Sequence, residues 1–371
     1  MLAVGLMSGT SMDGIDAVLA EFDDGGRFRG LRASHSGRYP EALRQRLLQV
    51  ARSETNALSL RELATLDAGI ADSFAAAALE LLAKAGVPAR DVAVLGSHGQ
   101  TVFHDTANTP WATLQLGDAN RIAVRTGLLT AADFRRMDMA LGGQGAPLVP
   151  AFHHALFASA DEPRCALNLG GIANITLLPG LDPAGVRGFD TGPANGLMNE
   201  WAERHLGQAY DADGAWAASG RCDEHLLAAL LADPYFSLPP PKSTGRSYFH
   251  LPWVEQRFPG LARLAAADVQ ATLAELTARS VAADIRAHGP GTRRVLVCGG
   301  GSRNGYLMDR LRAHLPGCAV QPSDDYGLDA DWIEAAAFAW LAVRRLRELP
   351  GNLPGVTGAL RLAVLGGLYR P

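Results

Sequence analysis

Short apolar runs alternate with longer stretches of helical periodicity along this chain. A nearly continuous apolar run of about four to eight residues predicts a buried strand, whereas apolar side chains that recur about every three to four residues predict a helix. In the first part of the chain these patterns predict strands at residues 2–6, 15–22 and 92–95 and helices at residues 40–52 and 60–85. The first two strands are joined by a loop of glycines and small polar residues, which predicts a hairpin.

The same order of patterns begins again after a stretch rich in glycine and proline at residues 142–150, where we place a domain boundary. The second set comprises predicted strands at residues 165–169, 172–178 and 294–297, a strand ending at Asp190, a helix with Val269, Leu273 and Leu276 on one face, and an apolar helix at residues 332–346. Each set opens with a hairpin whose loop is rich in glycine. We therefore expect two related α/β halves facing a cleft rather than one continuous doubly wound sheet.

Length and composition fit a globular protein of two domains. The chain has 371 residues, of which 48% are hydrophobic and 19% are charged, and this composition argues against disorder. A net charge of -4 does not favour binding to nucleic acid, which is itself negatively charged. The four cysteines are widely scattered, which excludes a zinc knuckle and gives no disulfide framework.

No membrane segment is expected. The apolar run at the N-terminus is too short for a signal peptide and follows no basic segment, and the alanine-rich stretch at residues 74–85 is interrupted by Glu80 and Lys84. These features predict a soluble, cytoplasmic protein.

The loop after the first predicted strand has the composition of a phosphate site. Gly9 and Gly14 allow the backbone to approach a ligand closely, while Asp13 and Asp16 would need a cation between themselves and a phosphate. The loop also contains the hydroxyl side chains of Ser8, Thr10 and Ser11. A Mg-nucleotide site is one interpretation, and an ordinary Gly/Ser hairpin turn is the other.

A second glycine-rich turn, residues 299–301, follows the strand predicted at residues 294–297. Neither GxxxxGK[ST] nor GxGxxG occurs here or elsewhere, so a Walker-type loop and a nicotinamide site are disfavoured. Three successive glycines would let a ligand lie against the backbone, with Ser302 and Asn304 able to cap the next helix. The alternative is a tight strand-to-helix turn without a ligand.

Asp190 is the strongest single candidate for catalysis. It is expected at the end of a strand, where the turn Thr191-Gly192-Pro193 would leave its carboxylate pointing into open space. A carboxylate in that position can act as a general base. An Asx-turn or helix N-cap explains the same local pattern equally well.

Other polar residues are more ambiguous. His98 and Gln100 lie in a predicted strand-end loop, and His98 has the chemistry to bind a sugar hydroxyl, although a lone histidine is more often structural. No HExxH pattern occurs, which disfavours a zinc hydrolase. Asp331 and Glu334 begin the apolar helix, where acids commonly complement the helix dipole.

Seven motifs, taken in order, resemble the anhydro-N-acetylmuramic acid kinase family. They are residues 9–16 (GTSMDGID), 97–101 (SHGQT), 167–174 (LNLGGIAN), 189–193 (FDTGP), 242–246 (KSTGR), 298–304 (CGGGSRN) and 331–335 (DWIEA). The resemblance spans nearly the whole chain. One departure is Ala194, where the family usually has a second glycine before Asn195.

The resemblance implies a bacterial enzyme of the sugar kinase, Hsp70 and actin superfamily. Two α/β domains would close over ATP and sugar: residues 1–145 together with a C-terminal helix at about residues 335–371, and residues 146–334. Family members tend to form homodimers. Binding to nucleic acid or membrane is not expected.

The resemblance also implies site residues. ATP phosphates and Mg²⁺ would be bound by Gly9, Thr10, Ser11, Met12, Asp13, Gly14, Ile15 and Asp16, with Asp13 and Asp16 holding the ion through water. The nucleotide would also meet Gly170, Gly171, Gly299, Gly300, Gly301 and Asn304. The sugar would meet His98, Gln100, Asn174 and Asn195, with Asp190 as catalytic base and Glu334 as a second carboxylate near the attacking water.

The implied reaction opens 1,6-anhydro-N-acetylmuramic acid with water and phosphorylates O6 from ATP, giving N-acetylmuramic acid 6-phosphate and ADP during peptidoglycan recycling. Two alternatives remain open. One is a kinase of another amino sugar or hexose, in which Asp190 would deprotonate the sugar hydroxyl directly. The other is a nucleotide-driven protein like Hsp70 that phosphorylates nothing, although no separate peptide-binding domain remains after both halves are assigned.

Overall fold

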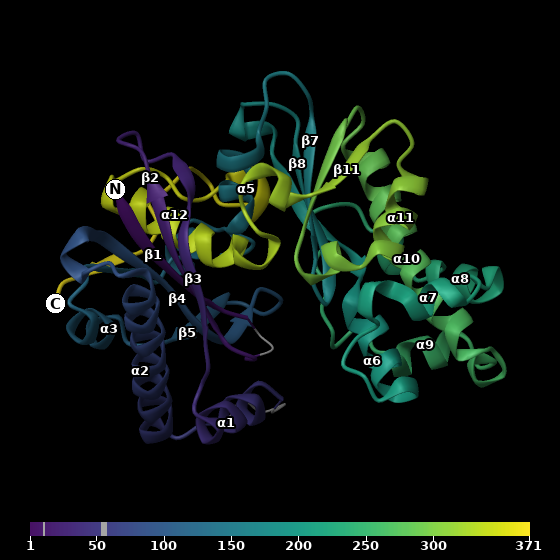
Figure 1. Ribbon diagram of the computed structural model, residues 1–371, viewed down its shortest axis with the longest axis horizontal. Coiled ribbons are helices and arrows are strands. Elements are labelled where there is room, and N and C mark those ends of the chain that lie inside the picture. The colour runs from purple at the N-terminus through teal and green to yellow at the C-terminus, as the bar shows by residue number, and fades with distance from the viewer. Residues whose placement is uncertain (10–11, 53–57) are drawn as a thin grey trace. The chain divides into compact units, whose positions relative to one another are not determined.

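The computed structural model describes residues 1–9, 12–52 and 58–371 (Figure 1). The chain divides into two compact units: unit 1 comprises Met1–Leu156 and Trp332–Pro371, and unit 2 comprises Phe157–Asp331. Each unit has one mixed sheet with helices packed on it, so the predicted two-part α/β fold is confirmed. The unit boundaries fall after residues 156 and 331, whereas the sequence analysis placed them after residues 145 and 334.

The sheet of unit 1 is centred on β1. In the described part of the unit the strands run in the order β12-β6-β4-β1-β2-β3, with β5 paired to β4. β1 is antiparallel to β2 and parallel to β4. The strands are β1 (Leu2–Ser8), β2 (Ile15–Phe22), β3 (Phe28–Gly37), β4 (Val92–Asp105), β5 (Ala112–Leu116), β6 (Thr130–Ala132) and β12 (Gly367–Tyr369). Strands β3, β5, β6 and β12 were not predicted from the sequence, and β4 extends ten residues beyond its predicted end at residue 95.

Two long helices cover the two faces of this sheet. Val4 and Leu6 of β1 belong to the core formed with α2, whereas a Cβ on Gly5 would meet the backbone of α12. Since successive residues of a strand point to opposite faces, α2 and α12 lie on opposite sides of β1. The helices of unit 1 are α1 (Glu41–Arg52), α2 (Leu60–Ala85), α3 (Ala119–Thr126), α4 (Arg136–Ala140), α5 (Val149–Phe157), α12 (Ile333–Leu346) and α13 (Pro354–Thr357).

Unit 2 repeats the strand plan of unit 1. Its sheet has the order β11-β10-β7-β8-β9, in which β7, β8 and β9 form an antiparallel meander while β7, β10 and β11 are parallel. The strands are β7 (Arg164–Leu169), β8 (Ile172–Leu178), β9 (Arg187–Pro193), β10 (Arg294–Cys298) and β11 (Ala319–Pro322). Unit 1 has the same arrangement in β1, β2, β3, β4 and β6. The two halves are therefore structurally related, as the two hairpins predicted.

A group of helices between β9 and β10 distinguishes unit 2. They are α6 (Asn195–Leu206), α7 (Ala215–Ser219), α8 (Glu224–Leu231), α9 (Leu251–Arg257) and α10 (Ala266–His288), and α11 (Gly305–His314) follows β10. α10 is the central helix of the group, because most of its side chains are buried against the sheet and the other helices.

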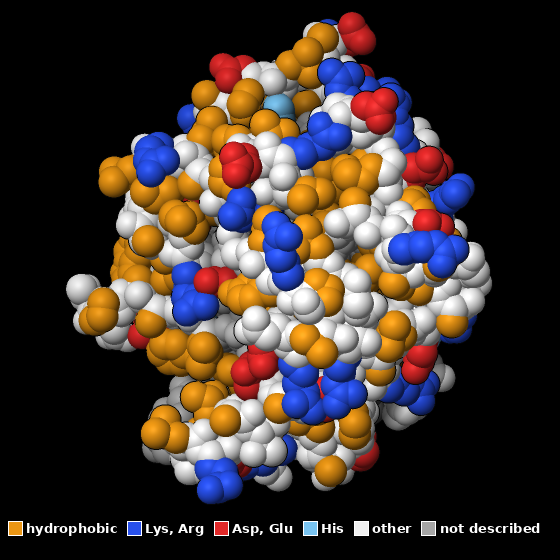
Figure 2. Space-filling view, turned by 90° about the vertical axis from the view of Figure 1, so that its left-hand side faces the viewer, with side chains coloured by type: hydrophobic (Ala, Val, Ile, Leu, Met, Phe, Trp, Pro, Cys, Tyr) orange, Lys and Arg blue, Asp and Glu red, His pale blue; other side chains and the backbone are white. Residues whose placement is uncertain are grey.

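The described residues include no candidate membrane-spanning helix, and one face of the molecule carries charges of both signs. No helix among the described residues is both long and apolar enough to cross a membrane. On the face drawn in Figure 2, acidic and basic side chains are interspersed with apolar ones.

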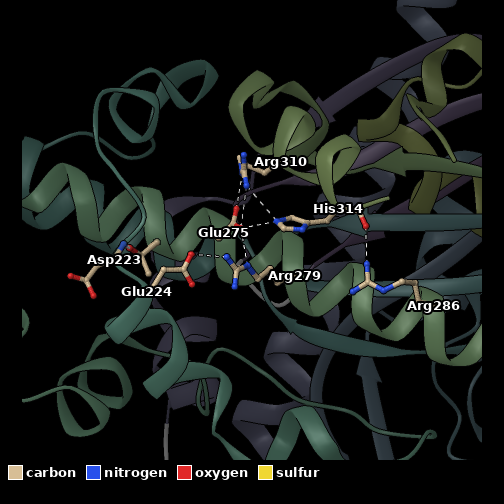
Figure 3. A network of polar contacts seen from close by, with 8 residues as sticks. Asp223, Glu224, Glu275, Arg279, Arg286, Arg310 and His314 are labelled. Atoms are coloured by element: carbon tan, nitrogen blue, oxygen red, sulfur yellow. Dashed lines mark hydrogen bonds and ion pairs between the residues drawn. The ribbon is translucent and has the colours of Figure 1, made fainter. Parts of the chain in front are cut away.

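A buried carboxylate fastens α10 to α11 (Figure 3). Glu275 accepts hydrogen bonds from Arg310 Nε (2.7 Å), Arg279 Nε (2.8 Å) and His314 Nε2 (2.6 Å). Burial would raise the pKa of Glu275, but these hydrogen bonds outweigh it and lower the pKa to about 2. The charged form of Glu275 is therefore stabilised by the fold.

We expect Glu275→Gln to lower the free energy of unfolding by about 3 kcal/mol at neutral pH, since charge-assisted hydrogen bonds to a buried acid are lost. Because the folded-state pKa is depressed, this stabilisation is complete above the unfolded pKa and disappears as pH falls toward 2. Urea unfolding at several pH values measures it. Glu255→Gln, at an exposed pair with Arg204, is the control and should change stability by less than about 1 kcal/mol. An equal loss for Glu275→Gln at every pH would contradict the expectation.

Candidate active site

The loop that follows β1 is closed by two hydrogen bonds. Ser8 Oγ donates a hydrogen bond to the carbonyl oxygen of Gly14 (2.8 Å), and the N–H of Met12 donates to the carbonyl of Gly9 (3.2 Å). These bonds close the loop across the ends of β1 and β2. The predicted ligand contacts of Thr10 and Ser11 lie outside the described residues.

The side chains of this loop divide into two groups. Met12 and Ile15 are buried in the core of unit 1, so only their backbone atoms can meet a ligand. Asp13 is exposed, and Asp16 is half-buried and accepts a hydrogen bond from Ser36 Oγ (3.2 Å). Among the described residues, no cluster of three or more His, Cys, Asp or Glu side chains is arranged to hold a metal ion.

Gln100 supports this loop from β4. Its side chain is fully buried, its Nε2 donates to the carbonyl of Gly9 (3.2 Å), and its Oε1 accepts from the hydroxyl of Tyr39 (3.0 Å). Both ends of the amide are thus engaged within unit 1. The structure places Gln100 as an anchor of the loop, and its predicted contact with a sugar stays a prediction.

His98 is a buried neutral imidazole. Its Nε2 accepts hydrogen bonds from Arg135 Nε (3.0 Å) and Nη2 (2.8 Å), so this nitrogen carries no proton. Burial and then the positive charge of Arg135 lower the pKa of His98 well below its usual value. Its ring also packs on Phe338, with centroids 4.6 Å apart. These contacts favour the structural role that the sequence analysis left open.

Arg135 was not predicted, because no motif marks it. Burial lowers its pKa to about 10, although the charge of Glu334 opposes this effect, and its Nη1 donates to the carbonyl of Gly145 (2.9 Å). Glu334 is exposed at the start of α12, and the charges of Arg135 and Asp16 both act on it. The carboxylate of Glu334 is therefore attracted by Arg135 and repelled by Asp16.

In unit 2, Asp190 lies within β9 rather than after its end. Strand β9 continues through Gly192 and Pro193, and it is the edge strand of its sheet, a position where proline is tolerated. The helix α6 is capped at Ala194 without any side-chain hydrogen bond. The N-cap interpretation of Asp190 is therefore wrong.

The strand register places three polar residues in one row. Asn174 of β8 is directly opposite Asp190 of β9, and Asn168 of β7 is directly opposite Asn174. Residues in register on neighbouring strands point to the same face of a sheet. Asn174, predicted to contact the sugar, thus lies beside Asp190, and Asn168 is an addition that the sequence analysis missed.

The two oxygens of the Asp190 carboxylate have different surroundings. Oδ2 accepts hydrogen bonds from the N–H of Thr244 (2.9 Å) and from Ser243 Oγ (3.1 Å). No hydrogen bond to Oδ1 is present within the described part of the chain. Burial raises the pKa of Asp190, and the bonds from Thr244 and Ser243 offset part of this effect. The result is a half-buried, more basic carboxylate with one oxygen left to accept a proton.

The loop Gly170-Gly171 closes onto the start of α6. The carbonyl of Gly170 accepts from the N–H of Asn195 (3.0 Å), and that of Gly171 accepts from the N–H of Ala194 (3.1 Å). Asn195 Nδ2 in turn donates to the carbonyl of Leu169 (2.8 Å). Ala194, where the family usually has glycine, is buried and lies four residues beyond Asp190, whose recorded hydrogen-bond donors are Ser243 and Thr244.

A pocket of about 490 Å³ opens beside the glycine triplet of unit 2. Its lining contains Asn195, Met198, Asn199, Tyr210, Asp211, Ala212, Asp213, Gly300, Arg303 and Asn304. A Cβ on Gly300 would meet nothing within 4 Å, whereas one on Gly299 would lie 2.4 Å from Asn168 Oδ1. Asn304 also caps α11 by accepting from the N–H of Leu307 (3.0 Å). The turn therefore both begins a helix and borders a cavity.

The structure thus groups the predicted residues differently from the sequence analysis. Asn195, predicted to contact the sugar, lines the same pocket as Gly300 and Asn304, which were predicted to contact the nucleotide. The segment at residues 210–213, which forms another side of the pocket, was missed because it carries no glycine-rich or motif-like pattern.

Comparison with known proteins decides the family. The family model described as anhydro-N-acetylmuramic acid kinase matches residues 1–371. The chain belongs to the anhydro-N-acetylmuramic acid kinase family. It is accordingly a phosphotransferase, as the sequence motifs predicted.

Relatives named anhydro-N-acetylmuramic acid kinase match nearly end to end. The protein from Xanthomonas axonopodis pv. citri (strain 306) is 54% identical over 99% of this chain and 98% of that protein. The one from Xanthomonas campestris pv. campestris (strain 8004) is 53% identical over 99% and 97%. Among solved structures, component A of the (R)-2-hydroxyglutaryl-CoA dehydratase of Acidaminococcus fermentans covers 94% of this chain and 99% of its own, at 12% identity and a TM-score of 0.49. So weak a structural likeness carries no argument about ligands.

Proposed function

We propose that the chain opens 1,6-anhydro-N-acetylmuramic acid with water and phosphorylates its O6 from ATP, giving N-acetylmuramic acid 6-phosphate and ADP. Membership of the family supports the substrate, because the relatives at 53–54% identity are named for it. The single observation that carries the chemistry is the carboxylate of Asp190, held through Oδ2 and open at Oδ1. We place the reaction in peptidoglycan recycling in the cytoplasm, carried out by a homodimer.

One base accounts for both parts of the reaction. Asp190 Oδ1 takes a proton from water while the water oxygen bonds to the anomeric carbon and the bond from that carbon to O6 breaks. O6 then bonds to the γ-phosphorus of ATP, and the bond from that phosphorus to the β,γ-bridging oxygen breaks to release ADP. Burial makes the carboxylate more basic, which favours proton transfer. We assign Glu334 as a second carboxylate near the attacking water.

The nucleotide would occupy the pocket of unit 2. Gly300, Asn304 and Asn195 line a cavity of about 490 Å³, and the open side of Gly300 lets a flat ligand approach the backbone. Gly299 and Gly301 shape the turn, and the loop Gly170-Gly171 lies at the start of α6 near Asn195.

The phosphates would be bound by the loop at residues 9–16 of unit 1, with Mg²⁺. Asp13 and Asp16 supply carboxylate oxygens, the kind of ligand that Mg²⁺ prefers, and would hold the ion through water. When bound, Mg²⁺ neutralises charge on the transferring phosphoryl group. Ser8 and Gln100 hold the loop in shape.

The sugar would be contacted by Asn174, which lies in register with the base. The neutral His98 would act mainly by orienting Arg135, whose guanidinium it partners. Two other functions share much of this machinery: phosphorylation of an ordinary amino sugar or hexose, and slow ATP hydrolysis without a sugar acceptor.

One experiment separates these possibilities. Purified protein is incubated with ATP and 1,6-anhydro-N-acetylmuramic acid, with Mg²⁺ or with excess chelator, while ADP and product mass are followed. We expect a product heavier by one water and one phosphoryl group, formed only when Mg²⁺ is present. A product heavier by a phosphoryl group alone, activity only with plain amino sugars, or ADP release that ignores the sugar would refute the proposal.

A further inference from the structure

A buried ion pair involves Lys242, a residue hydrogen-bonded through its backbone to the candidate base. The side chain of Lys242 is 2% exposed, and its Nζ lies 3.0 Å from Oδ2 of Asp284 on α10. The same ammonium lies 5.2 Å from the centre of the Tyr235 ring. Removing two charges from water costs free energy that their attraction often fails to recover, so such a pair is weak evidence for stability.

The backbone around Lys242 is attached to Asp190. The carbonyl oxygen of Lys242 accepts the N–H of Asp190 (3.1 Å), and the next two residues, Ser243 and Thr244, donate to its Oδ2. From the other side, the hydroxyl of Tyr235 donates to the carbonyl oxygen of Asp190 (2.8 Å). Three consecutive residues thus contact the base through its backbone and its carboxylate.

These three residues belong to neither a helix nor a strand. Residues 242–244 therefore lack the repeated backbone hydrogen bonds of a helix or a strand, which would otherwise hold the donors of Ser243 and Thr244 in place at the Asp190 carboxylate. The side chain of Lys242 runs inward to α10, a helix whose central residues are buried. The ion pair therefore ties this irregular segment to α10, in addition to its hydrogen bonds with Asp190.

We propose that the Lys242–Asp284 pair positions the catalytic base: by fixing residues 242–244 to α10 it keeps two donors on Oδ2 of Asp190 and leaves Oδ1 to accept the proton of water. This inference rests on the proposed function. Lys242 and Asp284 are positioning residues, because they act through Ser243 and Thr244 and do not touch the reacting atoms.

The proposal predicts a specific change in the pH profile. Titratable groups that face the pair are Tyr235 and His288, whose Nε2 lies 3.8 Å from Asp284 Oδ1. The donors on Oδ2 favour the charged form of Asp190, so their loss raises its pKa. We expect Lys242→Met to move the acid limb of kcat to higher pH, and to lower kcat about 10- to 100-fold, with KM for ATP changed by less than about twofold.

The test is a double-mutant cycle. Ser243→Ala removes one donor directly and should shift the acid limb in the same direction by a smaller amount. If Lys242 acts through Ser243 and Thr244, the kcat of the double variant K242M/S243A should be little lower than that of Lys242→Met alone. Glu275→Gln is the matched control, because it removes a buried ion-pair partner on the same helix without contact to residues 242–244, and it should leave the acid limb in place.

Several outcomes would overturn the inference. Multiplicative effects of Lys242→Met and Ser243→Ala on kcat, or an acid limb that stays in place while thermal stability falls, would leave the pair a structural contact only. If Lys242→Met does not fold, the variant K242M/D284L leaves no unpaired buried charge and should show the same shift. Failure of the proposed function is a separate result, since the unaltered protein would then form no product heavier by one water and one phosphoryl group from 1,6-anhydro-N-acetylmuramic acid.

Discussion

Replacing Asp190 with asparagine is expected to lower kcat by about 10²- to 10⁴-fold, the usual contribution of a general base. The amide oxygen of asparagine can still accept the bonds from Ser243 and Thr244 at the place of Oδ2. The amide nitrogen then stands where Oδ1 was, and it cannot take a proton. The fold and the nucleotide pocket should be preserved, so KM for ATP should change little. Steady-state rates of ADP and sugar phosphate formation measure both constants.

Asp182→Asn is the matched control for this variant. Asp182 is an exposed acid that caps the short turn before β9, with its Oδ1 accepting from the N–H of Ala184 (2.9 Å). The same chemical change should there leave kcat unchanged. If Asp190→Asn kept more than about a tenth of the wild-type kcat, Asp190 would not be the base.

The pH dependence of the wild-type kcat follows from the same carboxylate. A base must be deprotonated to work, so the rate falls as pH decreases through the pKa of Asp190. Because burial raises that pKa, the acid limb should lie above the value of 3.8 that an unperturbed aspartate has.

Replacing Gly5 with alanine is expected to destabilise unit 1 by about 3 kcal/mol or more, which is at the upper end for overpacking a core. The added Cβ would lie 2.0 Å from the carbonyl oxygen of Ala335 and 2.6 Å from the nitrogen of Ala339. Both atoms belong to the backbone of α12, so no side-chain rotation can relieve the overlap. Moving the helix would also displace Glu334, which lies in its first turn. Denaturant unfolding measures the loss.

Gly180→Ala provides the comparison for Gly5. Gly180 has no atom within 4 Å of an added Cβ, so alanine there should change stability by less than about 1 kcal/mol. If both variants were equally stable, α12 could not lie against β1 as closely as the structure has it. Gly96 of β4 tests the same contact, because its added Cβ would lie 2.1 Å from the carbonyl oxygen of Phe338.

Elements with a strong local pattern were predictable from the sequence. The helix at residues 60–85 and the strands at residues 15–22 and 172–178 appear with the predicted bounds. The helix has apolar residues at helical spacing, the strands are nearly continuous apolar runs, and each is followed by a glycine, proline or acidic residue. Strand β3 was missed because this edge strand interleaves arginine, serine and glycine with few apolar residues. Hydrogen bonds with β2 hold this segment as a strand, although its composition does not predict one.

The candidate site was likewise predictable only in part. Residue identity and motif order were sufficient to point to the family, the acid Asp190 and the glycine-rich turns, since these are properties of single residues and short segments. The hydrogen bonds of Gln100 and His98 were not predictable, because their partners, Gly9 and Tyr39 for Gln100 and Arg135 for His98, lie far along the chain.

The order of residue types along the chain specifies the chemistry available: which groups can take a proton, where the backbone can turn, and which runs must be buried. The contacts between these groups depend on the fold, which brings residues 242–244 to Asp190 and Asp284 to Lys242. A hydrogen bond or an ion pair needs a separation of about 3 Å, and local sequence patterns do not specify such separations. Those separations are set by the packing of β9 and α10 within one core.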